Sequence, residues 1–253
     1  SLGMEIQTIQ SAVAGVRRIN EFLSQSEPAP RKPVSLPANL PAGQPQVELR
    51  NVAFGYDDHT VLQSICLQVQ AGEQVTLAGR TGAGKSTVFK LLLGLYAPQS
   101  GSVLIEGVPA ADIADQDRRA LFGYVEQRFH QVPGTVRDQI TLYDPAISDQ
   151  AVRTATKLAG LSDTIESLPQ GYDTPCTPEL FSQGQWQLLS IARAAAADPR
   201  ILLLDEITAN LDAETENTVL QALRRVSADR TVISISHRTG AQTGRVIPIE
   251  PTH

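Results

Sequence analysis

Cysteine, methionine and tryptophan are scarce in this chain of 253 residues, which has two cysteines, one methionine and one tryptophan. Cys66 and Cys176 lie far apart and have neither the spacing of a metal site nor that of a disulfide framework, which favours a reducing compartment such as the cytosol. Because Cys66 lies between an isoleucine and a leucine, we expect it to be a small buried residue.

Long apolar runs and an excess of positive charge are also missing. No stretch approaches the length of about 20 apolar residues that a membrane helix needs, and no secretory signal is recognisable at the start. The net charge of −6 argues against broad nucleic-acid binding. With 42% hydrophobic and 19% charged residues, the composition suits a globular protein with one sizeable domain, or one domain and a small subdomain.

The first 45 residues differ from the rest. Apolar residues recur at steps of three and four over 4–24, which predicts an amphipathic helix. Six prolines then fall within 25–45, which predicts an extended linker. Residues 1–3 precede Met4, and we interpret them as an expression remnant. The main domain is therefore expected over 46–253.

Strand and helix patterns alternate through the main domain. Short apolar runs predict strands at 46–54, 61–70, 74–78, 102–106, 123–127, 201–205 and 231–236. Helical spacing is found over 88–95 and 213–227, and over most of 135–198 with breaks near 144–145 and 169–178. This alternation indicates an α/β fold with a mostly parallel sheet, and the long helical insertion suggests a separate lobe.

One motif predicts nucleotide binding. Residues 79–87 fit the pattern G-x-x-x-x-G-K-[ST] between a predicted strand and a predicted helix. The glycines let successive N–H groups point at one anion, and a helix that begins near Lys85 adds its positive end. Lys85 is expected to reach the β- and γ-phosphates, and Ser86 to bind Mg²⁺. The predicted nucleotide contacts of this loop are Gly79, Arg80, Thr81, Gly82, Ala83, Gly84, Lys85, Ser86 and Thr87.

A second signal is the acidic pair that follows the apolar run 201–204. Asp205 would lie beside the phosphate loop, where a carboxylate can hold Mg²⁺. Glu206 would orient and deprotonate the attacking water. The alternative interpretation is a polar strand end before the next helix, but the phosphate loop upstream favours the catalytic one.

A family resemblance becomes clear when the segment 182–185, Ser-Gln-Gly-Gln, is added to these motifs. In order along the chain, Tyr56, the phosphate loop, Gln127, this segment, the acidic pair, Asp212 and His237 resemble an ATP-binding cassette (ABC) ATPase over about 46–240. The resemblance implies a P-loop NTPase core with an N-terminal antiparallel β-subdomain, a helical subdomain at about 128–198, and hydrolysis of ATP with Mg²⁺.

The resemblance also implies roles for single residues. Tyr56 would stack on adenine, and Gln127 would contact Mg²⁺ and the attacking water. His237 would hydrogen-bond the γ-phosphate and join Lys85 and Glu206 in catalysis. The segment Ser182, Gln183, Gly184 and Gln185 would contact ATP held by a second copy, and Asp212 would line the seam between the copies.

Three of these residues also have simpler structural interpretations, and the local sequence supports a helix start at Ser182. Tyr56 could pack a turn, Asp212 could cap the helix at 213–227, and a lone histidine such as His237 is usually unremarkable. Ser182, before glutamines and an apolar run, is also a plausible helix start.

The exporter branch of the family is the most similar. The segments 10–23, 133–140 and 168–174 resemble those of exporter-type half-transporters. We therefore expect a piece of a longer protein at the cytoplasmic face of the cell membrane. This piece would itself be soluble, with a membrane domain fused upstream. Its expected partner is a second ATPase domain, identical or related, and not nucleic acid.

Several positions depart from the exporter pattern. Residues 175–180 lack the usual Gly-Glu-x-Gly element, which weakens the expectation of the family's contact with the opposite membrane domain. Gln183 replaces a glycine, Leu188 stands where arginine is usual, and few residues follow His237. No catalytic group is lost, so hydrolysis remains the expectation.

Two other functions are alternatives to transport. A regulatory cassette that dimerises with ATP but hydrolyses it poorly is the main alternative, and the presence of Glu206 and His237 argues against it. A cassette ATPase of DNA repair or chromosome structure would need long insertions between Lys85 and Ser182, but this interval has no heptad run.

Overall fold

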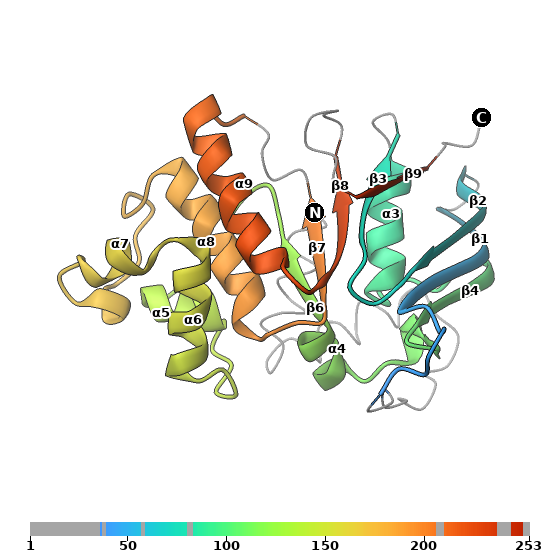
Figure 1. Cartoon of the computed structure of the whole chain (residues 1–253), viewed down its shortest axis with the longest axis horizontal. Coiled ribbons are helices and arrows are strands. Elements are labelled where there is room, and N and C mark those ends of the chain that lie inside the picture. The colour runs from blue at the N-terminus through green and yellow to red at the C-terminus, as the bar shows by residue number, and fades with distance from the viewer. Residues whose placement is uncertain are drawn as a thin grey trace. The chain divides into compact units, whose positions relative to one another are not determined.

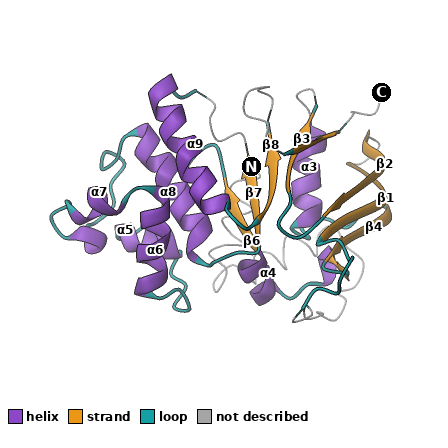
Figure 2. Ribbon diagram, in the orientation of Figure 1, coloured by secondary structure: helices purple, strands orange, loops and turns teal. Residues whose placement is uncertain are grey.

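The computed structural model describes residues 36, 39–56, 59–79, 83–205, 210–236 and 244–249. The chain divides into two units. The helical unit comprises Arg119–Arg230, and the strand-rich unit comprises the described residues before and after it. Figures 1 and 2 show the helices and strands of each unit.

An antiparallel sheet forms the first part of the strand-rich unit. Its order is β2-β1-β4-β5. These strands are β1 (Val47–Tyr56), β2 (His59–Val69), β4 (Ser100–Ile105) and β5 (Val108–Pro109). A bulge after Leu49 leaves Asn51 with a φ of 49° and brings Val52 and Phe54 back to the buried face. Gly101 lies opposite this bulge, where a Cβ atom would meet the carbonyl oxygens of β1 at 2.3 Å.

Parallel strands form the second part of the strand-rich unit. β3 (Gln74–Ala78) pairs with β8 (Thr231–Ile235) on one side and with β9 (Arg245–Pro248) on the other. Val75 and Leu77 are fully buried, as is typical of a strand inside a covered parallel sheet. The helix α3 (Ala83–Leu92) follows β3 and packs against β2 and β4.

The helical unit contains a parallel pair of strands and most of the helices. β6 (Phe122–Val125) pairs with β7 (Ile201–Asp205). The helix α8 (Gln183–Ala196) is buried along most of its length and packs against α5, α6, α9 and β6. The other α-helices of the unit are α5 (Val136–Thr141), α6 (Asp149–Ala159), α7 (Ser162–Glu166) and α9 (Ala213–Ser227). The remaining elements are η1 (Ala110–Asp112) and α4 (Asp115–Leu121), which precede β6, and η2 (Gly171–Asp173), which follows α7.

The structure confirms the α/β class, with parallel strands and a separate antiparallel sheet. Each strand predicted from the sequence is present, with bounds that differ by up to two residues, but β5 and β9 were not predicted. The helix predicted over 213–227 is α9, and the breaks near 144–145 and 169–178 separate the helices of the predicted insertion.

The prediction for Cys66 is wrong, because its side chain is exposed. Side chains alternate along β2, so that Leu67 and Val69 face the core while Cys66 and Gln68 face outward. The Cys66 thiol lies 3.1 Å from the side-chain oxygen of Asn51.

Several predictions lie outside the described residues. These are the remnant 1–3, the helix 4–24 and most of the linker 25–45, of which only 36 and 39–45 are described and contain no helix or strand. The domain boundaries therefore stay predictions. Among the described residues, no helix combines the length and the apolar character that crossing a membrane requires.

Candidate functional site

The phosphate loop joins β3 to α3 in the strand-rich unit. The Lys85 ammonium donates a hydrogen bond to the carbonyl oxygen of Gly79, directly after β3, at 2.8 Å. A Cβ atom at Gly79 would lie 2.4 Å from the carbonyl oxygen of Ile249, so this position requires glycine. Arg80, Thr81 and Gly82 lie outside the described residues.

The helix after the loop begins at Ala83, two residues earlier than expected. Gly84, Lys85 and Ser86 therefore lie in its first turn, where backbone N–H groups have no partner within the helix and can bind an anion. A Cβ atom at Gly84 would make only ordinary contacts, the nearest at 3.4 Å. The space around Gly84 therefore does not require glycine, and its predicted nucleotide contact stays a prediction.

Tyr56 lies at the end of β1 and packs into an aromatic cluster. Its ring contacts those of Phe54 and Tyr96 edge to face, with centroid distances of 5.0 Å and 5.8 Å. The Lys90 ammonium lies 5.8 Å from the Tyr56 ring, and the phenol oxygen lies 3.4 Å from the Thr87 hydroxyl. Tyr56, the predicted adenine contact, therefore packs against Thr87 and Lys90 of α3.

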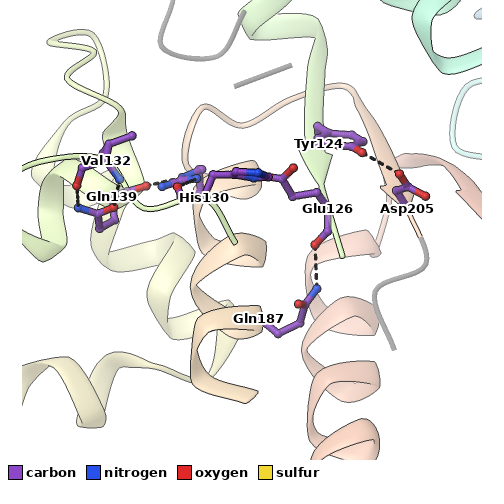
Figure 3. A network of polar contacts seen from close by, with 8 residues as sticks. Tyr124, Glu126, His130, Val132, Gln139, Gln187 and Asp205 are labelled. Carbon is purple, nitrogen blue, oxygen red and sulfur yellow. Dashed lines mark hydrogen bonds and ion pairs between the residues drawn. The ribbon is translucent and has the colours of Figure 1, made fainter. Parts of the chain in front are cut away.

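Asp205 ends β7, and its carboxylate interacts with a residue that sequence reasoning missed. The hydroxyl of Tyr124, on β6, donates a hydrogen bond to Asp205 Oδ2 at 2.9 Å (Figure 3). Tyr124 is buried, and this burial, followed by the negative charge of Asp205, raises the pKa of its phenol. Glu206, the next residue, lies outside the described residues.

The chain after β6 is held by a polar network (Figure 3). Glu126 is buried; its carboxylate lies 2.7 Å from His130 Nδ1, and its carbonyl oxygen accepts a hydrogen bond from Gln187 on α8. Burial raises the pKa of Glu126, and the hydrogen bond with His130 opposes this shift. Gln127, the predicted metal and water contact, is exposed beside this anchored residue.

Arg193, on α8, also contacts the chain that follows β6. Its guanidinium donates hydrogen bonds to the carbonyl oxygens of Gln139, at 2.5 Å, and His130, at 2.9 Å. The guanidinium also lies 4.1 Å from the centre of the Phe129 ring. Burial lowers the pKa of Arg193 to about 9, although the charge of Glu126 opposes the shift. The buried cation therefore holds residues 129–130 against the helix.

A pocket of about 820 Å³ in the helical unit brings two predicted site residues together. Gln127 and Gln183 both line it, next to Asn210 and Leu211. Three aromatic residues form its apolar wall: the Trp186 ring stacks on Phe129 and meets Phe181 edge to face, both at 5.1 Å.

Ser182 is the N-cap of α8, as the sequence indicated. Its hydroxyl accepts a hydrogen bond from the backbone N–H of Gln185, and the Gln185 side-chain oxygen accepts one from the backbone N–H of Ser182. The segment 182–185 is therefore a structured helix start, whose N–H groups are suited to an anion.

Asp212 caps α9, so the simpler interpretation of this residue is confirmed. Its carboxylate accepts hydrogen bonds from the backbone N–H and the hydroxyl of Thr215, at 2.9 Å and 2.8 Å. A Cβ atom at Gly184 would lie 2.5 Å from the Thr215 methyl group. Thr215 therefore lies between Asp212, the predicted seam residue, and the segment 182–185, a link that the sequence did not indicate. His237 lies outside the described residues.

The model of the ABC transporter family matches residues 62–209, which is more than half of the chain. The chain belongs to the ABC transporter family. This ABC transporter domain is 39% identical over 240 residues to YfiC of Bacillus subtilis, an uncharacterized ABC transporter ATP-binding protein. It is 37% identical over 217 residues to HlyB of Escherichia coli O157:H7, an alpha-hemolysin translocation ATP-binding protein.

The matched segment is a part of these longer relatives. The alignments cover 94% and 83% of this ABC transporter domain but only 39% of YfiC and 31% of HlyB. The solved structure of a bacterial Atm1-family ABC exporter with ATP bound is similar to it with a TM-score of 0.74 and 33% identity. That similarity covers 95% of this chain and 44% of the exporter chain.

Proposed function

We propose that this chain is the ATP-hydrolysing domain of an ABC export transporter. The observation that carries the proposal is Lys85, which lies in the first turn of α3 and donates a hydrogen bond to the carbonyl oxygen of Gly79, directly after β3. This arrangement offers a lysine and several backbone N–H groups to a polyphosphate. Because the chain belongs to the ABC transporter family, the nucleotide is expected to be ATP.

Binding would begin with the charges of the triphosphate. Lys85 would exchange its hydrogen bond with Gly79 for the β- and γ-phosphates, while the first-turn N–H groups of α3 and the loop residues 79–87 surround them. Tyr56 would supply an aromatic face for the adenine ring. Its edge-to-face contacts with Phe54 and Tyr96 would hold the ring in place before the nucleotide arrives.

The residues expected to hold Mg²⁺ fit a hard divalent cation. Ser86, Gln127 and Asp205 offer a hydroxyl, an amide and a carboxylate, and Mg²⁺ prefers oxygen ligands. Among the described residues, no group of three or more His, Cys, Asp or Glu is placed to hold a metal ion. A bound Mg²⁺ would neutralise charge on the phosphates.

Hydrolysis would depend mainly on positioning and charge stabilisation. Glu206 would take a proton from the attacking water, Gln127 would orient that water, and His237 would donate a hydrogen bond to the γ-phosphate. In an ATP-bound pair, Ser182 and Gly184 of a second copy would contact the γ-phosphate from the other side. The capped start of α8 supports this role, because it presents N–H groups that can bind an anion.

Transport would require parts that lie beyond this chain. The alignment covers only 31% of HlyB, a relative named as a translocation protein, and the remaining length supports a membrane domain fused upstream. We place this domain at the cytoplasmic face of the membrane, paired with an identical or related ATPase domain through a seam that includes Asp212. ATP would favour the closed pair, and hydrolysis would release it.

Phosphate release tests the proposed activity. The wild-type chain should release phosphate from ATP in the presence of Mg²⁺, Glu206→Gln should bind ATP without hydrolysing it, and Lys85→Ala should lose most of its affinity for ATP. Equal and very low release from wild type and Glu206→Gln, with ATP binding retained, would instead indicate a regulatory switch. Failure of the wild type to bind ATP would contradict the whole proposal.

A further inference from the structure

The side chains of Tyr124 and Asp205 meet because of the way β6 and β7 pair. Tyr124 lies opposite Leu203 in the parallel register. Asp205 follows Leu203 by two residues, so both side chains point to the same face of the sheet. The long tyrosine side chain extends along this face toward the end of β7, where its hydroxyl reaches Asp205 Oδ2 at 2.9 Å (Figure 3).

The packing of the Tyr124 ring does not require its hydroxyl group. Tyr124 is only 3% exposed, and a phenylalanine would fill the same apolar space. A buried hydroxyl needs a hydrogen-bond partner, and here that partner is the carboxylate expected to hold Mg²⁺. The nearby acid, Glu126, is held by other groups, with His130 on its carboxylate and Gln187 on its carbonyl oxygen.

We propose that Tyr124 is a positioning residue for Mg²⁺, which fixes the orientation of the Asp205 carboxylate through the hydrogen bond to Oδ2. This inference rests on the proposed function. The hydrogen bond engages Oδ2 and restricts rotation of the carboxylate, so that the orientation of Oδ1 is set before the metal binds. Groups that orient a ligand in this way commonly change metal affinity by about tenfold or more when they are removed.

Tyr124→Phe is the test variant, since it removes the hydroxyl and keeps the ring. The matched control is Tyr172→Phe, because Tyr172 is also a buried tyrosine of the helical unit, and its hydroxyl lies 2.7 Å from Thr156 Oγ1 instead of a site residue. Each variant loses a buried hydroxyl together with the hydrogen bond described for it. A general effect of hydroxyl removal on the fold should therefore appear in both.

The readout is nucleotide binding without hydrolysis. A fluorescent, non-hydrolysable ATP analogue is titrated in EDTA and over a series of Mg²⁺ concentrations. We expect Tyr124→Phe to need about tenfold more Mg²⁺ for half-maximal tight binding, while its affinity in EDTA equals that of the wild type. Tyr172→Phe should match the wild type in both conditions. Thermal unfolding of the two variants shows that the comparison is made between folded proteins.

A double-mutant cycle links the effect to Asp205. In an Asp205→Ala background there is no carboxylate to orient, so adding Tyr124→Phe should change the Mg²⁺ midpoint no further. An additional shift in that background would contradict the positioning role. So would a Tyr124→Phe variant that responds to Mg²⁺ as the wild type does. If the affinity of the wild type for the ATP analogue does not change with Mg²⁺ concentration, both the proposed function and the positioning role are overturned.

Discussion

The Ser182 hydroxyl accepts a hydrogen bond from the backbone N–H of Gln185 at 3.2 Å, and the Gln185 side-chain oxygen accepts one from the backbone N–H of Ser182 at 2.9 Å. The two residues satisfy two of the N–H groups that a helix start leaves without partners. Ser182 thus has a structural role in the free chain as well as its proposed role toward ATP. These two roles can be separated by mutation.

The first prediction concerns the cap at Ser182. Ser182→Ala should lower the free energy of unfolding by about 1 kcal/mol, whereas Ser182→Asn, which keeps a capping acceptor, should stay close to the wild type. Urea unfolding measures both. If the hydroxyl also contacts ATP of the second copy, Ser182→Asn will be stable yet impaired in ATP-driven dimerisation. Equal stability of Ser182→Ala and the wild type would contradict the structural role.

The second prediction concerns the close approach of α8 and α9. Gly184→Ala places a methyl group 2.5 Å from Thr215 Cγ2, and we expect this overpacking to cost about 1–3 kcal/mol. Thr215→Ser removes that methyl group but keeps the hydroxyl that bonds Asp212. Gly184→Ala should therefore cost much less in a Thr215→Ser background. The same cost in both backgrounds would show that Thr215 is not the cause.

Local patterns predicted the capped helix starts well, and they predicted the strand and the helix that flank the motif 79–87. Ser182 before an apolar run and Asp212 before 213–227 are capping signals that act within three residues. The loop 79–87 likewise needs only its own sequence and the flanking elements. Such features depend on neighbours along the chain, and a single sequence contains them in full.

Contacts between distant segments were not predictable in the same way. The bond from Tyr124 to Asp205 joins residues 81 positions apart and depends on the register of β6 against β7. The contact between Gly184 and Thr215 depends on how two helices cross. Cys66 was misassigned because flanking apolar residues indicate a buried segment, while the phase of the strand decides which side chain faces out.

The third prediction concerns the charge of the cap at Asp212. Hydrogen bonds from the backbone N–H of Thr215, and then from its hydroxyl, hold the pKa of Asp212 below its usual range. The carboxylate therefore stabilises the fold above the pKa of an unfolded aspartate, about 3.9, and this contribution is lost as pH falls through the lower folded pKa.

Asp212→Asn keeps a capping oxygen but removes the charge, which makes it the informative variant. The wild type should unfold at a higher urea concentration than Asp212→Asn at pH 7, and the difference should shrink as pH falls below about 4. Glu166→Gln is the control, because it removes an exposed charge away from the cap. A difference that stays constant with pH would contradict the assignment.

The fourth prediction uses the two cysteines as probes of the fold. Cys66 is exposed, whereas Cys176 is partly buried, and burial raises the pKa of its thiol to about 11. Only the thiolate reacts with maleimides and disulfide reagents, so Cys176 should react slowly at pH 8. In Cys66→Ser, where Cys176 is the remaining thiol, the labelling rate should keep rising with pH until about 11. Mass spectrometry of the labelled chain follows both sites, and rapid labelling of Cys176 at pH 8 would show that residues around it open in solution.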